Sequence, residues 1–371
     1  MAAGDPTHWQ RRLWRHFDYG LLAATVAVTF FGLAMIYSAN IGTPDRQDLV
    51  WKQATFAVVG LVGIVALAAL DYQLLGSLEK PIYVTANLVL LLTRLFGYEQ
   101  LGAKRWVSIG GVTFQPSEFA KLMIIIALAH FLARREARMG RLRTVLLSLA
   151  YIALPALLIF QQPDLSTAIV LLVIWLAMAF TAGMRLRHLL LLFLIVALAT
   201  PLIWSQLEPY QHKRVLQFLG LINDPDTQYN IDQARIAIGS GGWLGKGFAR
   251  GSQSQLHFLK VRHTDFIFSV IGEEMGFLGG TLLMLLLAFI VYRACRAALL
   301  ARDTFGRLIA VGIATLIFFQ ATVNIGMNLG LLPVTGIPLP FVSYGRSALL
   351  SLLLGLGLVE SVVMRYRKLD F

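Results

Sequence analysis

The sequence predicts an all-α integral membrane protein with ten transmembrane helices and a large extracytoplasmic loop between helices seven and eight. Of the 371 residues, 57% are hydrophobic and only 14% are charged, whereas soluble domains carry about 25% charged residues. The apolar residues form long runs, and a transmembrane helix needs roughly 20 mostly apolar residues. Basic residues gather in the short segments between these runs. We therefore treat residues 1–371 as a single polytopic membrane domain.

Ten apolar runs are long enough to be candidate spans, and each predicts one helix of the fold. The fifth and sixth runs are separated only by Gln161-Gln162-Pro163-Asp164, which is typical of a tight hairpin. The expected spans lie near 19–38, 53–70, 80–97, 117–134, 144–160, 164–183, 187–205, 266–292, 308–330 and 342–363.

The positions of lysine and arginine predict the orientation, because cytoplasmic loops carry an excess of basic residues. With ten spans, five basic clusters fall on one side, which we expect to be cytoplasmic together with both termini. Residues 206–265 then form an extracytoplasmic loop. The clusters contain Arg11, Arg12, Arg15, Arg134, Arg135, Arg138, Arg141, Arg143, Arg185, Arg187, Arg293, Arg296, Arg302, Arg307, Arg365, Arg367 and Lys368.

A formal net charge of +12 would suggest a nucleic-acid partner for a soluble protein. Here the basic residues flank apolar spans, so we expect contact with membrane lipids and no nucleic-acid binding. The single cysteine, Cys295, excludes an internal disulfide and a metal site built from several cysteines.

The outer loop, 206–265, is too long and too rich in aromatic residues to be a simple connection. Its segment Ile231–Ile238 has amphipathic helical spacing and is expected to lie along the membrane surface. The glycines of 239–247 would let backbone amides approach a ligand, and Lys246 adds charge for a phosphate. On the glycines alone, a flexible turn between helices is the favoured interpretation.

Ionisable residues inside the spans are functional candidates because burying charge in a membrane is costly. Glu118 and Lys121 stand three residues apart, so they share a helix face and can form an ion pair. Asp164 begins the sixth span, where a helix cap is the favoured interpretation. Glu273 and Glu274 lie about two turns into the eighth span, where one can face a polar interior and the other can pair with an arginine.

Asp265 lies where the polar loop meets an apolar span, in Arg262-His263-Thr264-Asp265-Phe266. A carboxylate in this position is suited to chemistry on a lipid-linked substrate. His263 is interpreted as a hydrogen-bonding neighbour, because the seven histidines show no metal-ligand spacing. Arg346 follows the proline-containing run 338–345, which should break a helix and line a cavity.

These motifs closely resemble the SEDS family (shape, elongation, division and sporulation proteins) over nearly the whole chain. Within the family, Gln253-Ser254-Gln255-Leu256 and the short polar termini are more similar to the RodA elongation branch than to the FtsW division branch. The resemblance rests on Lys104-Arg105-Trp106, Gln115 to Lys121, Gln162-Pro163-Asp164-Leu165, Gly239 to Gly247, Gly251 to Phe258, His263 to Phe268, Glu273-Glu274-Met275-Gly276 and Pro338 to Gly345.

The resemblance implies the SEDS fold and a peptidoglycan glycosyltransferase that uses lipid II in the bacterial inner membrane. It implies that Asp265 is catalytic and that Arg105, Glu118, Lys121 and Asp164 line a central polar cavity. It also implies a class B penicillin-binding protein and the scaffold proteins MreC and MreD as partners. Further candidate substrate contacts are Arg214, Lys246, Gln253, His263, Glu274 and Ser343.

Three positions depart from the family pattern. Lys260-Val261 stands where Pro-Glu is usual, and Ser166 and Arg346 each replace a usual glycine. The first departure lies in the expected catalytic loop, and Arg346 brings a cation to the expected cavity mouth.

The reaction implied by the resemblance is an inverting transfer, which needs a base for the acceptor hydroxyl and positive charge for the leaving diphosphate. Asp265 is the candidate base, and Arg105, Lys121 and Lys246 are candidates for the diphosphate. A divalent cation, Mg²⁺ or Mn²⁺, would make Asp265 a metal ligand instead. Two alternatives stay open: a lipid flippase or transporter, which would use the same polar cavity, and a non-catalytic scaffold that activates a partner. Hydropathy and spacing alone do not separate a transporter from an enzyme.

Overall fold

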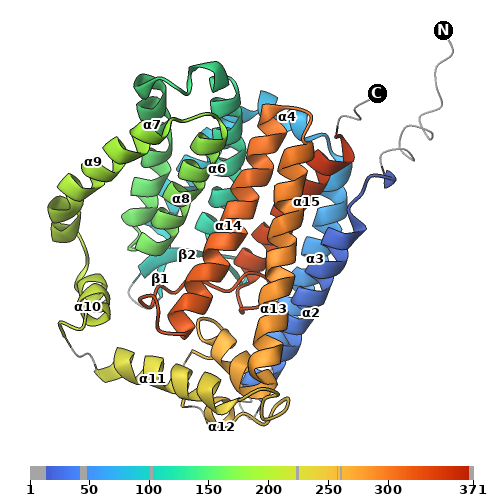
Figure 1. Ribbon diagram of the computed structural model, residues 1–371, viewed down its shortest axis with the longest axis vertical. Helices are drawn as coiled ribbons and strands as arrows, with labels where there is room; N and C mark the ends of the chain where they lie inside the picture. Colours follow the sequence, from blue (N-terminus) through green and yellow to red (C-terminus); the bar gives the residue numbers. More distant parts are fainter. Residues whose placement is uncertain are drawn as a thin grey trace.

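Each of the ten expected spans coincides with a helix of the bundle in Figure 1. The computed structural model describes residues 14–41, 48–100, 103–222, 225–256, 258–259 and 261–366. The bundle helices are α2 (Tyr19–Asn40), α3 (Asp48–Ala69), α5 (Glu79–Phe96), α6 (Pro116–Ala133), α7 (Leu142–Phe160), α8 (Leu165–Thr181), α9 (Leu186–Ser205), α13 (Ile267–Leu300), α14 (Thr304–Asn328) and α15 (Arg346–Met364).

Seven of these helices are long and apolar enough to cross a membrane, as judged over the described residues. Helices α8 and α9 are apolar but have shorter apolar lengths, and α5 carries Glu79, Lys80 and Arg94. The protein is therefore a multi-pass membrane protein, while the count of ten crossings stays a prediction.

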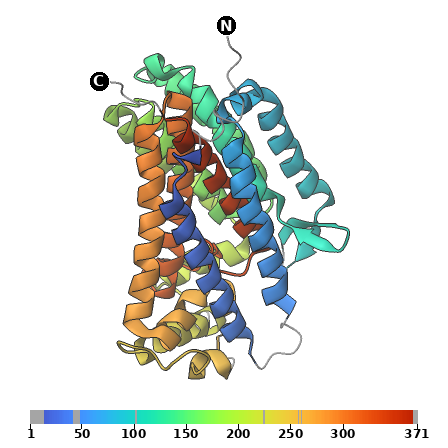
Figure 2. The same cartoon turned by 90° about the vertical axis from the view of Figure 1, so that its right-hand side faces the viewer.

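A small antiparallel sheet between α5 and α6 was not expected from the sequence. Its strands are β1 (Tyr98–Gln100), β2 (Ala103–Ile109) and β3 (Val112–Phe114), in the order β1-β2-β3. Gly110 and Gly111, both at positive φ, close the β2–β3 hairpin, a two-residue turn that glycine pairs favour. Figure 2 shows this sheet beside the lower part of α3. Two short elements, α4 (Tyr72–Ser77) and the 3₁₀ helix η2 (Glu136–Arg138), also lie in connections.

Helix α13 is not the single straight span that the sequence predicts. Gly276 has φ 66° and ψ −164°, so the helical conformation is broken there. The residues before the break, from Ile267, form a short buried helix, and the residues after it form the long membrane helix. The lower end of α13 in Figure 1 accordingly turns away from the long part.

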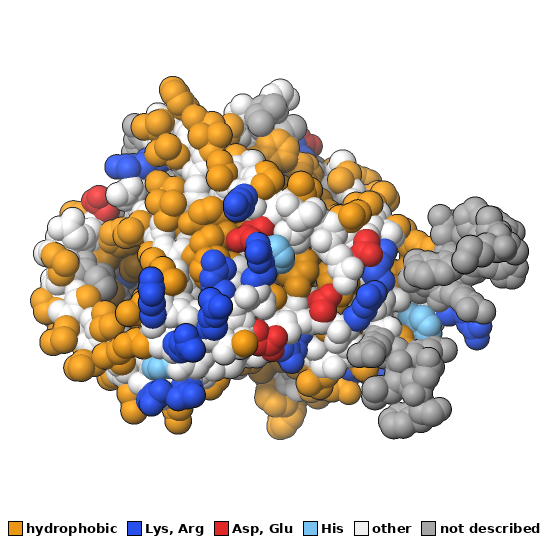
Figure 3. Space-filling view, turned by 90° about the horizontal axis from the view of Figure 1, so that it is seen from above, with side chains coloured by type: hydrophobic (Ala, Val, Ile, Leu, Met, Phe, Trp, Pro, Cys, Tyr) orange, Lys and Arg blue, Asp and Glu red, His pale blue; other side chains and the backbone are white. Residues whose placement is uncertain are grey.

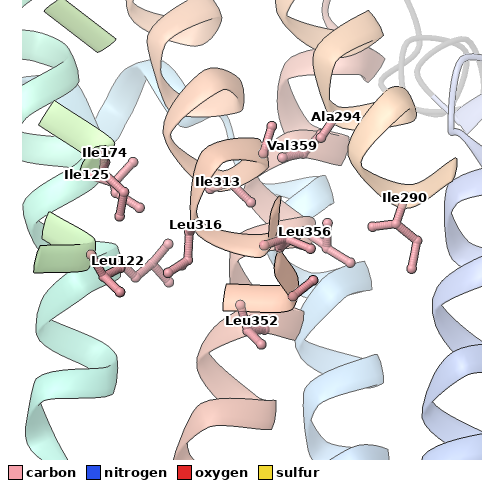
Figure 4. Packing of buried hydrophobic residues seen from close by; sticks show 14 of the residues in the cluster. Leu122, Ile125, Ile174, Ile290, Ala294, Ile313, Leu316, Leu352, Leu356 and Val359 are labelled. Carbon is pink, nitrogen blue, oxygen red and sulfur yellow. The ribbon is translucent and has the colours of Figure 1, made fainter. Parts of the chain in front are cut away.

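Helix α14 occupies the centre of the apolar core (Figure 4). Its Ile313 and Leu316 face α6 on one side, and the same region of α14 packs on α15 on the other. The hydrophobic effect contributes little to helix association within lipid, because the acyl chains are as apolar as the side chains. The bundle therefore depends on van der Waals contact between complementary helix surfaces. Other buried residues of this layer are Leu122, Ile125, Ile174, Ile290, Ala294, Leu352, Leu356 and Val359.

Helices α3 and α15 approach closely because glycines stand at their contact. A Cβ atom at Gly357 of α15 would lie 2.9 Å from the Ile64 Cα of α3, and one at Gly60 would lie 2.4 Å from Leu353 Cδ1. Real side chains do not tolerate such distances, so any side chain at Gly357 must separate the two backbones.

The described residues of the outer loop, 206–265, include three helices. They are α10 (Pro209–Phe218), α11 (Pro225–Ser240) and α12 (Ser252–Gln255). The expected helix Ile231–Ile238 lies within α11, which packs on α13 through Ala234 and Ala237. In Figure 1 the chain leaves the bundle through α9 and α10 and returns beneath it through α11.

We expect Gly357→Ala to lower the free energy of unfolding by about 1–3 kcal/mol, because the methyl group overpacks a backbone contact. Thermal unfolding of the purified protein in detergent measures this loss. Gly355→Ala is the matched control, since its Cβ would meet only side-chain atoms at 3.5 Å or more. Equal melting temperatures for the two variants would contradict the assigned contact.

Candidate active site

The backbone around Asp265 is held by the loop that precedes α15. The Tyr344 amide donates to the His263 carbonyl at 2.9 Å, and the Ser343 hydroxyl donates to the Thr264 carbonyl at 2.6 Å. The same hydroxyl oxygen accepts the Leu339 amide at 2.9 Å. Ser343 therefore joins two loops, and its predicted substrate contact stays a prediction.

Two asparagines of α14 donate hydrogen bonds to the backbone carbonyl of Asp265. Asn324 Nδ2 and Asn328 Nδ2 donate to the Asp265 carbonyl at 3.1 and 2.9 Å. Asn328 Oδ1 accepts from the Ser269 hydroxyl at 2.6 Å, and Asn324 Nδ2 also donates to the Ile337 carbonyl at 2.8 Å. Three consecutive carbonyls, 263 to 265, are thus bonded to residues of the C-terminal part of the chain.

Sequence reasoning missed both asparagines, although a signal was present. Asn324 and Asn328 stand four residues apart in an apolar span, so they share one helix face. Polar side chains in such a helix need internal partners, and here the partners are the loop carbonyls.

Helices α2 and α3 hold the same loops from the other side. The buried Arg262 donates through Nε to the Ala39 carbonyl at the end of α2. Gln53 of α3 donates to the Ser343 carbonyl and accepts the Gly345 amide, both at 3.2 Å. The irregular backbone near Asp265 is therefore bonded from both sides of the bundle.

Asp265 is partly exposed, and the charges that act on it come from Arg214 of α10 and Arg105 of β2. Loss of hydration raises the pKa of Asp265 to about 6, and the positive charges of Arg214 and Arg105 act in the opposite direction. A Cβ atom at Gly336 would lie 3.8 Å from Asp265 Oδ2, so the glycine leaves space beside the carboxylate.

Arg105 of β2 acts on Asp265 through its charge and forms an ion pair with Asp164 at the start of α8. Its NH1 lies 3.6 Å from Asp164 Oδ2, and Gln115 Nε2 lies 3.5 Å from the same oxygen. Asp164 Oδ1 accepts the Thr167 amide at 3.1 Å. Asp164 therefore caps α8, as expected, and also pairs with Arg105.

Glu118 and Lys121 form the ion pair that their spacing predicts. The distance from Lys121 Nζ to Glu118 Oε1 is 2.7 Å, and both side chains are buried. Glu118 Oε2 is buried and has no hydrogen-bond partner among the described residues. One carboxylate oxygen of this pair therefore has unused hydrogen-bonding capacity.

Lys246 and Glu273 anchor the loop before α12. Lys246 Nζ lies 2.7 Å from Glu273 Oε1, which also accepts the Ser252 hydroxyl and the Gln253 amide at 3.1 and 2.9 Å. Glu273 Oε2 accepts the Ser254 amide at 3.1 Å. The structure thus brings Lys246 and Gln253 to Glu273, and their substrate contacts stay predictions.

Glu274 does not join the Asp265 group, and the expected pairing of Glu273 or Glu274 with an arginine is wrong among the described residues. Glu274 Oε2 accepts from the Ser38 hydroxyl and the Ala249 amide at 2.5 and 3.0 Å, and Oε1 accepts from Ser254 at 3.2 Å. Its side chain is fully buried. Both oxygens are therefore used to fasten the loop to α2 and α13.

The glycines of 239–247 serve close packing against the break in α13. A Cβ atom at Gly241 would lie 1.9 Å from the Gly272 carbonyl oxygen, and one at Gly245 would lie 2.1 Å from that of Glu274. The Lys246 and Gly247 amides donate to the carbonyls of residues 273 and 274, both at 3.0 Å. The interpretation as a turn between helices fits, because these amides are not available to a ligand.

Two of the residues that depart from the family pattern, Ser166 and Arg346, contact neighbouring elements of the structure. The Ser166 hydroxyl donates to the Thr335 carbonyl at 2.7 Å. Arg346 bonds to Thr113 of β3 and lies 5.7 Å from the centre of the Phe56 ring. Both residues therefore join elements around the site. Lys260 lies outside the described residues.

A cavity of about 120 Å³ lies between α10, α11 and residues 330–334. Arg214, Gln228 and Arg235 line it, and Arg235 donates to the Gly330 carbonyl at 3.1 Å.

His263 lies beside Tyr344, with ring centroids 5.9 Å apart. Within the described part of the chain, no three His, Cys, Asp or Glu residues converge on a metal site.

Comparisons with known proteins show the family to which the chain belongs. Residues 19–368 match the model of the FtsW/RodA/SpoVE family, described as cell cycle proteins. The peptidoglycan glycosyltransferase MrdB of Escherichia coli K12 is 38% identical over 94% of this chain and 93% of its own. Stage V sporulation protein E of Bacillus subtilis is 35% identical over 93% of this chain and 96% of its own.

Solved structures extend the similarity to the fold. One chain of a peptidoglycan synthase complex has a TM-score of 0.81 and 34% identity, over 95% of this chain and 99% of that chain. RodA of Thermus thermophilus has a TM-score of 0.70 and 31% identity, over 94% and 96%. The chain therefore belongs to the FtsW/RodA/SpoVE family.

Proposed function

We propose that this protein is a peptidoglycan glycosyltransferase that polymerises lipid II during cell elongation, with Asp265 as its catalytic residue. The observation that carries this proposal is a carboxylate with a pKa near 6 on a backbone fixed at three consecutive carbonyls. Relatives from E. coli and Trichlorobacter lovleyi that share 38% and 36% identity are named peptidoglycan glycosyltransferases.

Asp265 is proposed to accept the proton of the acceptor 4-hydroxyl. The hydroxyl oxygen then forms a bond to C1 of the donor sugar, and the bond from C1 to the diphosphate oxygen breaks. The product has inverted configuration, and undecaprenyl pyrophosphate leaves. A carboxylate with a pKa near 6 is a stronger base than an ordinary aspartate and is still mostly ionised at pH 7.

Positive charge for the leaving diphosphate is proposed to come from Arg105 and Arg214, whose charges already act on Asp265. Lys121, paired with Glu118, is proposed to line the same polar cavity. Asp265 would be the residue that holds a divalent cation, Mg²⁺ or Mn²⁺, since such ions bind one or two carboxylates together with substrate phosphates. The cation would supply further charge neutralisation.

The proposed orientation puts Asp265 outside the cell and both termini in the cytoplasm. In support, Lys and Arg side chains spread over the end of the bundle where α2 begins and α15 ends (Figure 3), as expected for a cytoplasmic face. A class B penicillin-binding protein, MreC and MreD are the proposed partners, and a similar chain occurs in a peptidoglycan synthase complex.

Asp265→Asn is expected to lower the rate of lipid II polymerisation by about 10²- to 10⁴-fold, because the amide cannot take up the proton. Glycan formation is measured on a gel with labelled lipid II and the purified partner. Asp232→Asn is the control, since Asp232 lies in the same loop and bonds to Gln228. Near-normal polymer formation by Asp265→Asn would refute the catalytic role and favour a scaffold. Lipid translocation without polymer formation by the wild type would favour a flippase.

The pH dependence of kcat/KM is expected to follow Asp265. Activity should be present above pH 6 and lost as the pH falls through about 6, where the base becomes protonated. Arg214→Gln removes a charge that lowers this pKa, so the acidic limb should move to higher pH.

Arg235→Gln is the matched control for this shift, because Arg235 lines the same cavity as Arg214 and does not act on the pKa of Asp265. The test is the midpoint of the acidic limb in both variants. An unmoved midpoint in Arg214→Gln, or an equal shift in Arg235→Gln, would refute the electrostatic role.

Asn328→Leu is expected to lower kcat by about ten- to a hundredfold with little change in KM, because Asp265 loses part of its backbone support. Steady-state kinetics with lipid II separate the two constants. Gln320→Leu is the control, because it replaces another buried amide side chain of α14 whose Oε1 has no hydrogen-bond partner among the described residues. A similar loss in both variants would indicate general damage to α14 instead of positioning.

A further inference from the structure

A second cavity lies at the end of the bundle opposite Asp265. The segment before α2, the last turns of α13 and the end of α15 enclose about 330 Å³ there. Arg15, His16, Asp18, Arg293 and Arg296 form its polar lining, and apolar side chains of the same elements form the rest. The mechanism proposed for Asp265 makes no use of this cavity.

The one carboxylate in the lining is already neutralised. Arg293 Nε donates to Asp18 Oδ2 at 2.6 Å, and its NH2 contacts Oδ1 in a bidentate pair. Asp18 Oδ1 also accepts the Leu21 amide at 2.9 Å and so caps α2. The Asp18 amide donates to Glu360, which is fully buried in α15 and does not line the cavity. Asp18 therefore offers no free negative charge to the cavity.

The remaining charge of the lining is positive. Arg15 and Arg296 have no carboxylate partner in the part of the chain that the structure describes. The His16 ring packs edge-on against Tyr366, with centroids 4.9 Å apart. Guanidinium groups are strong donors to phosphate oxygens, so the lining suits an anionic phosphate group.

The cavity lies at the level expected for lipid headgroups. The part of α13 after Gly276 has 24 residues up to Leu300 and spans about 36 Å, whereas the hydrocarbon core measures about 30 Å. Its last turns, with Arg296, therefore reach the headgroup region. Tyr19 and Tyr292 are 64% and 58% exposed nearby, as aromatic residues at a membrane interface are.

We propose that this cavity binds the phosphate headgroup of an anionic phospholipid from the adjacent leaflet. Arg15 and Arg296 donate to the phosphate oxygens, and the apolar wall formed by Phe17, Leu300 and Val363 contacts the first part of the acyl chains. Basic pockets between helices at this depth recognise such headgroups. A bound lipid ties the ends of α2, α13 and α15 together.

The test uses the purified full-length protein in a neutral detergent. Phosphatidylglycerol and phosphatidylcholine with the same acyl chains are added, and bound lipids are counted by native mass spectrometry while melting is followed in parallel. The wild type is expected to bind phosphatidylglycerol preferentially and to melt at a higher temperature with it. Combined Arg15→Gln and Arg296→Gln should weaken this binding about thirtyfold.

Combined Arg187→Gln and Arg302→Gln is the control, because these exposed arginines lie at the same end of the bundle and outside the cavity. Arg15→Gln alone is a second variant, since Arg15 is exposed and its loss should leave folding intact. Equal binding of the two lipids by the wild type, or an equal loss in the control, overturns the proposal. Stabilisation by inorganic phosphate but not by phosphatidylglycerol also overturns it, because the site would then take a free anion.

Discussion

Hydrogen bonds to the carbonyls of His263, Thr264 and Asp265 are the constraint on which the site depends. Irregular backbone at the edge of a membrane is tolerated only where its polar groups have partners inside the protein. The loop before α15 and the asparagine face of α14 supply those partners. The same bonds therefore satisfy the backbone polar groups and fix the point of the backbone from which the Asp265 side chain extends.

Buried charge is handled differently in the different parts of the molecule. Glu273 and Glu274 accept so many hydrogen bonds that they act as anchors for the loop before α12. Near Asp265, the positive charges of Arg214 and Arg105 act on the carboxylate. Burying a carboxylate is costly unless it is paired, and Asp265, which is partly exposed, has a raised pKa.

Hydropathy was sufficient to predict the helical bundle, and the spacing of Glu118 and Lys121 was sufficient to predict their ion pair. The sheet that carries Arg105 was missed because its strands are short and give no apolar period, although Gly110-Gly111 marks its turn. The break at Gly276 and the bonds from Asn324 and Asn328 were missed because they depend on contacts between distant segments. Motif resemblance singled out Asp265 and Glu274 alike, but it could not show that Glu274 accepts hydrogen bonds from Ser38, Ala249 and Ser254, because those partners are distant in the sequence.

The break at Gly276 also separates two mechanical roles within α13. A membrane helix adjusts its tilt when the surrounding bilayer becomes thicker or thinner. The long part of α13 can follow such a change, while the short part, from Ile267 to the break, is bonded to α14 and to the outer loop. The height of Asp265 is thus set by its hydrogen bonds to protein neighbours, which do not involve the lipid around the long part of α13.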